Sequence, residues 1–344
     1  MIIAWLKPYR ALIATLLLVY FTMALVSAID TRGAYLNPSH WRWDTPRFIV
    51  EETRIPGHES KSYTFNTYNQ RKILEQAAIN LTLGVGMTFV ILTGGIDLSV
   101  GSLLALCNVI FVDLLRRGDS SGVFIFALFA CLAAGTLCGV ANGWLSVTLR
   151  IPSFIVTLGT LLVIRGIAYW VSGGQTKLMA CSPELSVGIP LGVSIVAVAA
   201  ASFFLATTAG GRRIYAVGGN LLAAQYSGVR TGLVRVLCFA FSGLCAGLAG
   251  VIYWSRTSTG SYTAGEGAEL YAIAAVVLGG TRLAGGEGTI FGTLIGALIM
   301  SVLANGLNTA GVHELTQKII VGCVLIVAAY IDSRRSRRGG VAVM

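Results

Sequence analysis

Charged residues are scarce in this sequence of 344 residues. Only 12% of the residues are Asp, Glu, Lys or Arg, whereas 55% are hydrophobic and the mean hydropathy is +0.76. Soluble domains average about 25% charged residues. A bilayer core requires about 20 apolar residues per helix, and such runs fill most of the chain. The composition therefore excludes a soluble globular protein and indicates an integral membrane protein.

Three sequence signatures of catalytic or metal chemistry are also missing. No lysine follows a glycine, so there is no GxxxxGK[ST] phosphate loop and the chain is not expected to be an ATPase. The seven cysteines form no CxxC pair, and six of them lie inside apolar runs, where packing explains them. His40, His58 and His313 lie far apart without HExxH spacing. We therefore expect neither a metal site nor a cofactor in this chain, and no enzymatic activity.

The apolar runs predict an all-α polytopic membrane protein of about ten transmembrane helices. A β-barrel would instead alternate apolar and polar residues with a period of two. Two runs are shorter than a full span and could pair as re-entrant half-helices, so counts from eight to ten are compatible with the sequence. The ten runs are Ala11 to Ile29, Ala77 to Thr93, Leu98 to Leu115, Val123 to Leu149, Phe154 to Val171, Val193 to Thr208, Val234 to Trp254, Ala268 to Leu278, Thr289 to Leu307 and Ile319 to Ile331.

The basic residues predict the orientation of these spans. Four arginines follow the last run and predict a cytoplasmic C-terminus, while Lys7 and Arg10 predict the same for the N-terminus. Two cytoplasmic ends require an even number of crossings, which favours ten. Arg116 and Arg117 then lie outside the cell, which contradicts the rule that basic residues collect on the cytoplasmic side. The net charge of +10 is spread over span ends that meet membrane lipid, and no basic groove predicts nucleic acid as a partner.

Residues 1–344 are predicted to form a single transmembrane domain with three polar segments, 30–72, 209–233 and the basic tail 333–344. The segment from Asp30 to Lys72 mixes acidic and basic residues with Trp41 and Trp43 and is expected outside the membrane. It has two interpretations, a docking surface for an external partner or a loop specific to this lineage.

The stretch "LTGGIDLSVGS" interrupts an apolar run. Gly94 and Gly95 each cost about 1 kcal/mol relative to Ala in a helix interior, so the helix is expected to unwind there. Asp97 could then cap the restarted helix through the N–H of Ser99 or Val100. Irregular backbone at membrane depth occurs where it is buried in protein or lines a water-filled cavity. Asp97 therefore has two interpretations, a helix cap or, with Ser99 and Ser102, the wall of a polar path.

The glycine motif occurs twice. Gly94 and Gly95 are followed five residues later by Gly-Ser-Leu, and Gly285 and Gly286 are followed five residues later by Gly-Thr-Leu. This echo predicts two structural repeats around one path, as in many transporters.

The segment "GRRIYAVGGNLLAAQYSGVRTG" predicts a short helix outside the membrane. Asn220 is a good N-cap, residues 221–226 give one or two helical turns, and Gly228 is a good stop. The small residues Ala223 and Ala224 suit docking into a groove of a partner protein. A plain basic connector is the alternative interpretation.

Several motifs together resemble the permease subunits of bacterial ribose-type sugar importers of the ABC class, which include the ribose, xylose, arabinose and galactose permeases. The motifs are "GMTFVILTGGIDLSVGS", "IPSFIVTLGT", "GGNLLAAQYSGV" and "AELYAIAAVVLGGTRLAGGEGTIFGTLIGALI", and the resemblance covers about residues 71–332. It implies a homo- or heterodimeric permease in the bacterial inner membrane. It also implies an ATP-binding subunit, which binds ATP and Mg, on the cytoplasmic face and a sugar-binding protein on the outer face.

The resemblance also implies where coupling to the ATPase occurs and which side chains line the path. The residues of the coupling segment are Gly218, Gly219, Asn220, Ala223, Ala224, Ser227 and Gly228. The candidates for the translocation path are Asn80, Thr93, Gly94, Gly95, Asp97, Ser99, Asn142, Glu269 and Asn305. Alternating access driven by the ATPase is the expected mechanism.

Departures from the family pattern and rival functions stay open on the sequence alone. Tyr271 stands where an acid is common, Arg282 stands where Ser or Ala is usual, and the 30–72 segment is longer, so the exact sugar is undetermined. Branched-chain amino acids or nucleosides are alternative substrates. The other two alternatives are an ion-coupled carrier that uses Asp97 and Glu269 as a proton relay and a scaffold that recruits partners through residues 30–72.

The orientation can be tested by cysteine labelling in a background without native cysteines. A cysteine in place of Ser60 is expected to react with an impermeant thiol reagent added to intact cells, because residues 30–72 are predicted outside. A cysteine in place of Ser336 is expected to react only after the membrane is permeabilised. The reverse pattern would invert the topology.

Overall fold

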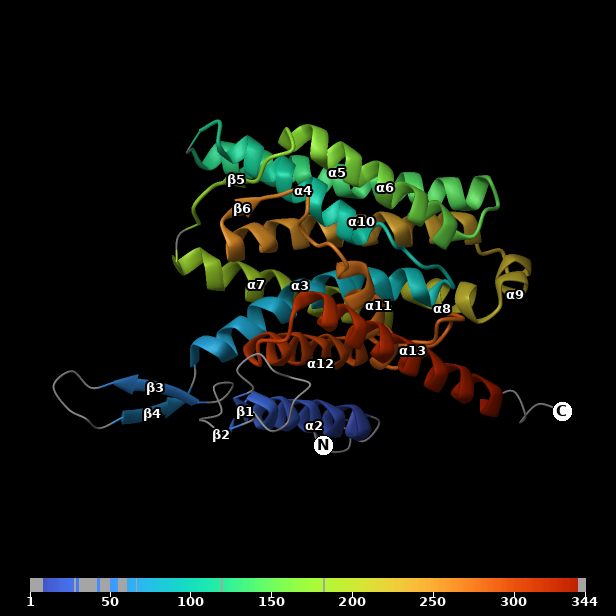
Figure 1. Cartoon of the computed structure of the whole chain (residues 1–344). Coiled ribbons are helices and arrows are strands. Elements are labelled where there is room, and N and C mark those ends of the chain that lie inside the picture. The colour runs from blue at the N-terminus through green and yellow to red at the C-terminus, as the bar shows by residue number, and fades with distance from the viewer. Residues whose placement is uncertain are drawn as a thin grey trace.

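A computed structural model describes residues 9–27, 29–30, 42–43, 50–54, 61–65, 67–118, 120–181 and 183–339. They fold mainly into helices (Figure 1). The helices are α2 Arg10–Ser27, α3 Thr67–Leu92, α4 Val100–Leu115, α5 Ser121–Thr148, α6 Ser153–Ser172, α7 Pro183–Thr207, α8 Ala209–Gly219, α9 Leu221–Tyr226, α10 Thr231–Thr257, α11 Ala268–Leu278, α12 Ile290–Thr309 and α13 Glu314–Gly339.

Short antiparallel strand pairs connect some of the helices. The strands pair as β1 with β2, β3 with β4 and β5 with β6. Their bounds are β1 Ile29–Asp30, β2 Arg42–Trp43, β3 Val50–Arg54, β4 Lys61–Phe65, β5 Lys177–Leu178 and β6 Thr259–Gly260. Figure 1 places the β3–β4 hairpin and β5 at the opposite end of the molecule from α9.

The all-α membrane class is confirmed. In the described part of the chain, seven helices are long and apolar enough to cross a membrane, namely α3, α5, α6, α7, α10, α12 and α13. Three shorter apolar helices accompany them, α2, α4 and α11. Each of these ten helices corresponds to one of the ten predicted runs, and α8 and α9 occupy the polar segment between α7 and α10.

Two helices extend beyond the predicted apolar runs into the predicted polar segments, because hydropathy detects only the apolar part of a helix. Helix α3 begins at Thr67, so it includes the last residues assigned to the 30–72 segment. An ion pair between Arg71 and Glu75, with 2.9 Å between Nε and Oε1, stabilises its polar first turns. Helix α13 continues to Gly339, so most of the 333–344 tail is helical, and residues 340–344 lie outside the described part.

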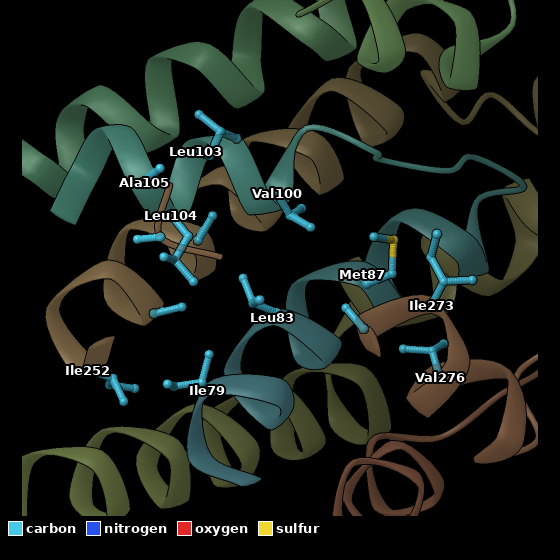
Figure 2. Packing of buried hydrophobic residues seen from close by; sticks show 14 of the residues in the cluster. Ile79, Leu83, Met87, Val100, Leu103, Leu104, Ala105, Ile252, Ile273 and Val276 are labelled. Atoms are coloured by element: carbon cyan, nitrogen blue, oxygen red, sulfur yellow. The ribbon is translucent and has the colours of Figure 1, made fainter. Parts of the chain in front are cut away.

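The core lies around α3 and α10. Of the apolar window of α3, 89% is buried inside the protein, against 17% for α6. Helices that are apolar all round are expected at such central positions. Figure 2 shows Leu83 of α3 in the middle of a cluster of buried residues, with Leu104 and Ile252 on one side and Met87, Ile273 and Val276 on the other.

Small residues bring the central helices together. A Cβ atom at Gly243 of α10 would collide with the carbonyl oxygen of Gly135 in α5, and one at Gly139 would collide with the carbonyl oxygen of Phe239. Such close approach of backbones is the usual way in which helices associate in membranes. The high glycine content therefore serves packing between helices.

Helices α4 and α11 meet at their N-terminal ends in the interior. Helix α11 has 11 residues and is about 16 Å long, roughly half of a bilayer core. A Cβ atom at Gly101, near the start of α4, would collide with the Glu269 carboxylate near the start of α11. Helix α11 therefore fits the predicted re-entrant half-helix, whereas the other short run, Ile319 to Ile331, is part of the longer α13.

Candidate functional site

The interruption after α3 is held by a buried carboxylate. Helix α3 ends at Leu92, and the chain turns at Gly94, whose φ is +75°. The Asp97 side chain is 0% exposed. Its Oδ1 accepts hydrogen bonds from the Ser99 N–H, at 3.0 Å, and from the Ser99 hydroxyl, at 2.6 Å, while Oδ2 accepts one from the Ser242 hydroxyl, at 2.9 Å. The predicted bond from the Ser99 N–H is therefore present.

The cap of α4 itself differs from the prediction. Ser99, not Asp97, is the N-cap residue of α4, and the Ser99 side chain makes no capping hydrogen bond. Asp97 acts two residues earlier, where it fixes the chain that leads into the helix. The Ser102 hydroxyl donates to the Ser99 carbonyl oxygen at 2.8 Å and is buried.

Side chains of the neighbouring helices α5 and α6 hold the same segment. The Asn142 amide of α5 donates to the Ser99 hydroxyl at 2.8 Å. Ser153 and Thr157 of α6 accept hydrogen bonds from the backbone N–H groups of Ile96 and Leu98, each at 3.0 Å. The irregular backbone is thus satisfied by protein groups, as membrane depth requires. Asn142 Oδ1 is buried and has no hydrogen-bond partner among the described residues.

Three glycine pairs that are far apart in the sequence converge beside this segment, namely Gly94–Gly95, Gly218–Gly219 and Gly285–Gly286. We call this contact the glycine junction. Gly286 N–H donates to the Leu92 carbonyl oxygen at 3.0 Å. A Cβ atom at Gly218 would collide with that same oxygen and with the Gly286 nitrogen, and one at Gly285 would lie 2.9 Å from the Gly94 nitrogen. The two copies of the repeated glycine motif, Gly94–Gly95 and Gly285–Gly286, are therefore in contact, and α8 contacts both.

Helix α9 is formed as predicted. Asn220 caps it, with Oδ1 accepting from the Ala223 N–H at 2.9 Å, and Gly228 follows it with a φ of +80°. The preceding helix α8 was not predicted from the sequence. Its N-cap Thr208 accepts from the Gly211 N–H at 3.1 Å, a signal that sequence inspection could have found.

The exposed face of α9 is not the one that the two alanines suggested. Ala224 is only 5% exposed, whereas Leu222 is 63% and Tyr226 is 91% exposed. Gln225 ties α9 to the start of α10 through a hydrogen bond to Thr231 of 3.1 Å. Large apolar side chains, with Ala223 beside them, therefore form the free surface of this helix.

A polar pocket of about 400 Å³ lies near the start of α3 and the end of α10, away from the glycine junction. Helix α3 contributes Gln76 and Asn80, α10 contributes Tyr253 and Arg256, and α11 contributes Tyr271. Arg256 donates a hydrogen bond to the Gln76 side chain. Sequence reasoning selected only Asn80 of this set. The spacing of Gln76 and Asn80, one helical turn apart, was the available signal.

Ion pairs surround the pocket. Arg256 Nε lies 4.0 Å from Glu75 Oε2. Lys318 of α13 pairs with Glu266, at 3.4 Å, and with Glu314, at 3.2 Å, both of which line the pocket. The pocket therefore combines amide and phenol groups with charges that are already paired.

The remaining path candidates lie at different depths: Asn80 lines the pocket, and Thr93 follows the end of α3 beside the glycine junction. Asn80 donates to the Ser301 hydroxyl at 2.8 Å, and Asn305 lies one turn farther along the same helix. Asn305 Oδ1 and Glu269 Oε2 are buried and lack hydrogen-bond partners among the described residues. The Thr93 hydroxyl is used locally, since it donates to the Val90 carbonyl oxygen at 2.8 Å.

Both described ends of the chain lie near the segment that contains Gly285 and Gly286. The Tyr9 hydroxyl is 3.2 Å from the Thr289 hydroxyl, and the Leu283 N–H donates to Asp332 at 3.2 Å. Since this segment contacts α8, both ends share a face with α9, as Figure 1 also shows for the end of α13. A chain that crosses the membrane an even number of times has both ends on the same side, as found here.

Comparison with known proteins identifies the family. The family model described as "Branched-chain amino acid transport system / permease component" matches residues 70–329. The chain belongs to this permease family. It is 40% identical to the ribose import permease protein of Escherichia coli (strain K12) over 79% of this chain and 87% of the relative.

Two further relatives extend the comparison. The D-allose transport system permease protein of E. coli (strain K12) is 36% identical over 91% of this chain and 98% of the relative. The autoinducer 2 import system permease protein of E. coli (strain K12 / DH10B) is 37% identical over 81% and 83% of the two chains. No solved structure matches the chain with comparable significance.

Family membership sets the class of activity. The chain is a multi-pass inner-membrane permease of an ABC importer, a transport subunit and not an enzyme. Such a permease works with an ATPase and a periplasmic binding protein. The ion-coupled carrier and the scaffold, which the sequence alone left open, find no support among these relatives.

Substitutions at Asp97 test how the interruption is held. Asp97→Asn keeps an acceptor for Ser99, and the Ser242 hydroxyl can accept from the new amide, so we expect a small loss of stability. Asp97→Ala leaves buried donors unsatisfied and is expected to cost about 1–3 kcal/mol for each donor. Thermal unfolding of the purified chain measures both. Equal stability of the Asn and Ala variants would contradict the assigned role.

The glycine junction offers a matched pair of variants. Gly218→Ala places a methyl group against two backbone groups that cannot rotate away, and overpacking of this kind costs about 1–3 kcal/mol. Gly219→Ala is the control, since a Cβ atom there meets nothing within 4 Å. We expect lower thermal stability and slower transport for Gly218→Ala only. Equal thermal stability and equal transport rates of the two variants would contradict the role assigned to the close contact.

Proposed function

We propose that this chain forms the path of a monosaccharide importer and that the polar pocket receives the sugar. The observation that carries the proposal is the chemistry of the pocket. Its amide and guanidinium groups and its phenol hydroxyls suit a molecule covered with hydroxyl groups, and two tyrosine rings offer apolar surface to a sugar ring. The names of the relatives, which include ribose and D-allose permeases, support a sugar as the substrate.

Further buried polar side chains are available to the path. Asn80 lines the pocket and donates to Ser301, and Asn305 and Glu269 have acceptor atoms without partners among the described residues. Weak and numerous hydrogen bonds suit a sugar that must enter and leave. The carboxylate of Asp97, in contrast, is enclosed and accepts three hydrogen bonds, so we assign it to holding the interruption in place.

Movement is transmitted by the glycine junction. Helix α9 receives the ATPase through its exposed face, and α8 contacts the end of α3 and the segment before α12 without intervening side chains. Tyr215 of α8 also donates to the Gly288 carbonyl oxygen at 2.9 Å. A displacement of α9 is thereby passed to two segments of the path, which is the rearrangement that alternating access requires.

The proposal also assigns an orientation and an assembly. The α9 face and both chain ends lie in the cytoplasm, and the pocket opens on the outer side. A second permease copy or a paralogue completes a dimer within the lipid bilayer. ATP and Mg are bound by the separate ATPase, because this chain lacks a phosphate loop.

Removal of two hydroxyl groups tests the sugar pocket. In vesicles containing the permease, its ATPase and its binding protein, we expect Tyr253→Phe with Tyr271→Phe to raise the KM for ribose or allose transport. The expected increase is about fivefold for each lost hydrogen bond of about 1 kcal/mol. Tyr169→Phe, outside the pocket, is the control. An unchanged KM would remove the pocket from the path.

Charged residues on α9 test coupling. Leu222→Asp with Tyr226→Asp is expected to lower substrate-stimulated ATP hydrolysis at least about tenfold, because the exposed apolar face would no longer fit the ATPase groove. Leu178→Asp introduces the same chemistry at a site that is 75% exposed on β5, at the other end of the molecule. Full stimulation in the α9 variant would place coupling elsewhere.

A further inference from the structure

A second cavity lies beside the coupling segment and differs from the polar pocket in chemistry and location. It has a volume of about 730 Å³, within the range of ligand sites. Its walls come from α3, α7, α8, α10 and the turn after α9. We call it the α7–α10 groove.

The walls of the groove are largely apolar and open sideways. Phe89 of α3, Phe204 of α7 and Phe241 of α10 form an aromatic wall, with Phe89 4.4 Å from Phe241 and 5.9 Å from Phe204 between ring centroids. Leu233 and Leu237 of α10 are 52% and 58% exposed. Both leucines belong to α10, which is long and apolar enough to cross a membrane.

Two arginines line the same groove. Arg213 belongs to α8, and Arg230 immediately precedes α10. Both side chains are exposed, and neither pairs with a carboxylate among the described residues. From residue 185 to residue 265 the sequence contains no Asp or Glu at all. The groove is therefore apolar along its walls and positive where it meets the coupling segment.

We propose that the α7–α10 groove binds an anionic phospholipid, with the phosphate on Arg213 and Arg230 and an acyl chain against the aromatic wall. Basic pockets between membrane helices recognise anionic headgroups in this way, and guanidinium groups bind phosphate oxygens in a bidentate manner. A second copy of the chain fits less well, because it would bring the same segment without acidic residues. A soluble anion would leave the apolar walls unused.

The bound lipid has a structural consequence for coupling. Arg213 lies before α9 in the chain and Arg230 lies after it, and Ser227 and Gly228, at the end of α9, also line the groove. One phosphate held by both arginines would brace the two ends of the coupling segment. The lipid would then set how freely α9 moves, which makes it a stabiliser of the coupling segment and no part of the sugar path.

Native mass spectrometry of the purified full chain tests the proposal directly, with phosphatidylglycerol and phosphatidylcholine of equal acyl length as probes. We expect the chain to retain phosphatidylglycerol about 30-fold more strongly, at about fivefold for each arginine. Arg213→Gln with Arg230→Gln is expected to abolish this preference. Arg212→Gln, the adjacent arginine of α8 outside the groove, is expected to keep it. Equal retention of both lipids by the unmodified chain would overturn the proposal.

A second pair of variants tests the apolar part without changing charge. Ala200→Phe fills the groove and is expected to weaken phosphatidylglycerol binding, whereas Val196→Phe, on the same helix but outside the groove, is not. Displacement of the lipid by millimolar glycerol phosphate would overturn the lipid assignment in favour of a soluble anion. A dimer lost in Ala200→Phe, with lipid retention unchanged, would assign the groove to a second copy. Because the readout is lipid retention, failure here is distinguishable from failure of the sugar path.

Discussion

The contact between backbones at the glycine junction is the constraint on which the rest of this structure depends. The end of α3, the end of α8 and the segment between α11 and α12 meet there without side chains between them. Side chains can change rotamer to absorb a small displacement, but backbone groups in direct contact cannot. A shift of α8 toward either segment therefore meets backbone groups and not a movable side chain. The same contact fixes the depth at which the chain leaves α3 and re-enters toward α4.

Helix α3 connects the two functional ends of the molecule. It carries Gln76 in the polar pocket and Leu92 at the glycine junction, and it is 26 residues long, about 39 Å at 1.5 Å per residue. Its flanks are packed against α10, α12 and α11, so it lies in the middle of the protein although its composition is that of a lipid-facing span. A long buried helix of this kind can transmit an axial or rotational displacement between the pocket and the junction.

Helices α4 and α11 both have an acid near the positive N-terminal end, where the helix dipole favours negative charge. Asp97 precedes α4, and Glu269 lies in the first turn of α11. The environments of the two acids differ. Asp97 has three hydrogen-bond donors, while Glu269 Oε2 has none among the described residues and lies against Gly101. Both oxygens of the Asp97 carboxylate are thus held by hydrogen bonds, whereas the Glu269 carboxylate has one oxygen that is not.

The sequence by itself determined the features that depend on neighbouring residues. Apolar runs marked every membrane helix, because burial in lipid requires a continuous length of hydrophobic residues. Asn220 and Gly228 predicted α9, and Asp97 predicted the bond to the Ser99 N–H, because caps and turns join residues only a few positions apart. Only the tertiary structure decided the meeting of Gly218 with Gly286, the pairing of Gln76 with Arg256 and the burial of Ala224. These contacts join segments tens to hundreds of residues apart, and they depend on how the helices pack, which no local pattern records.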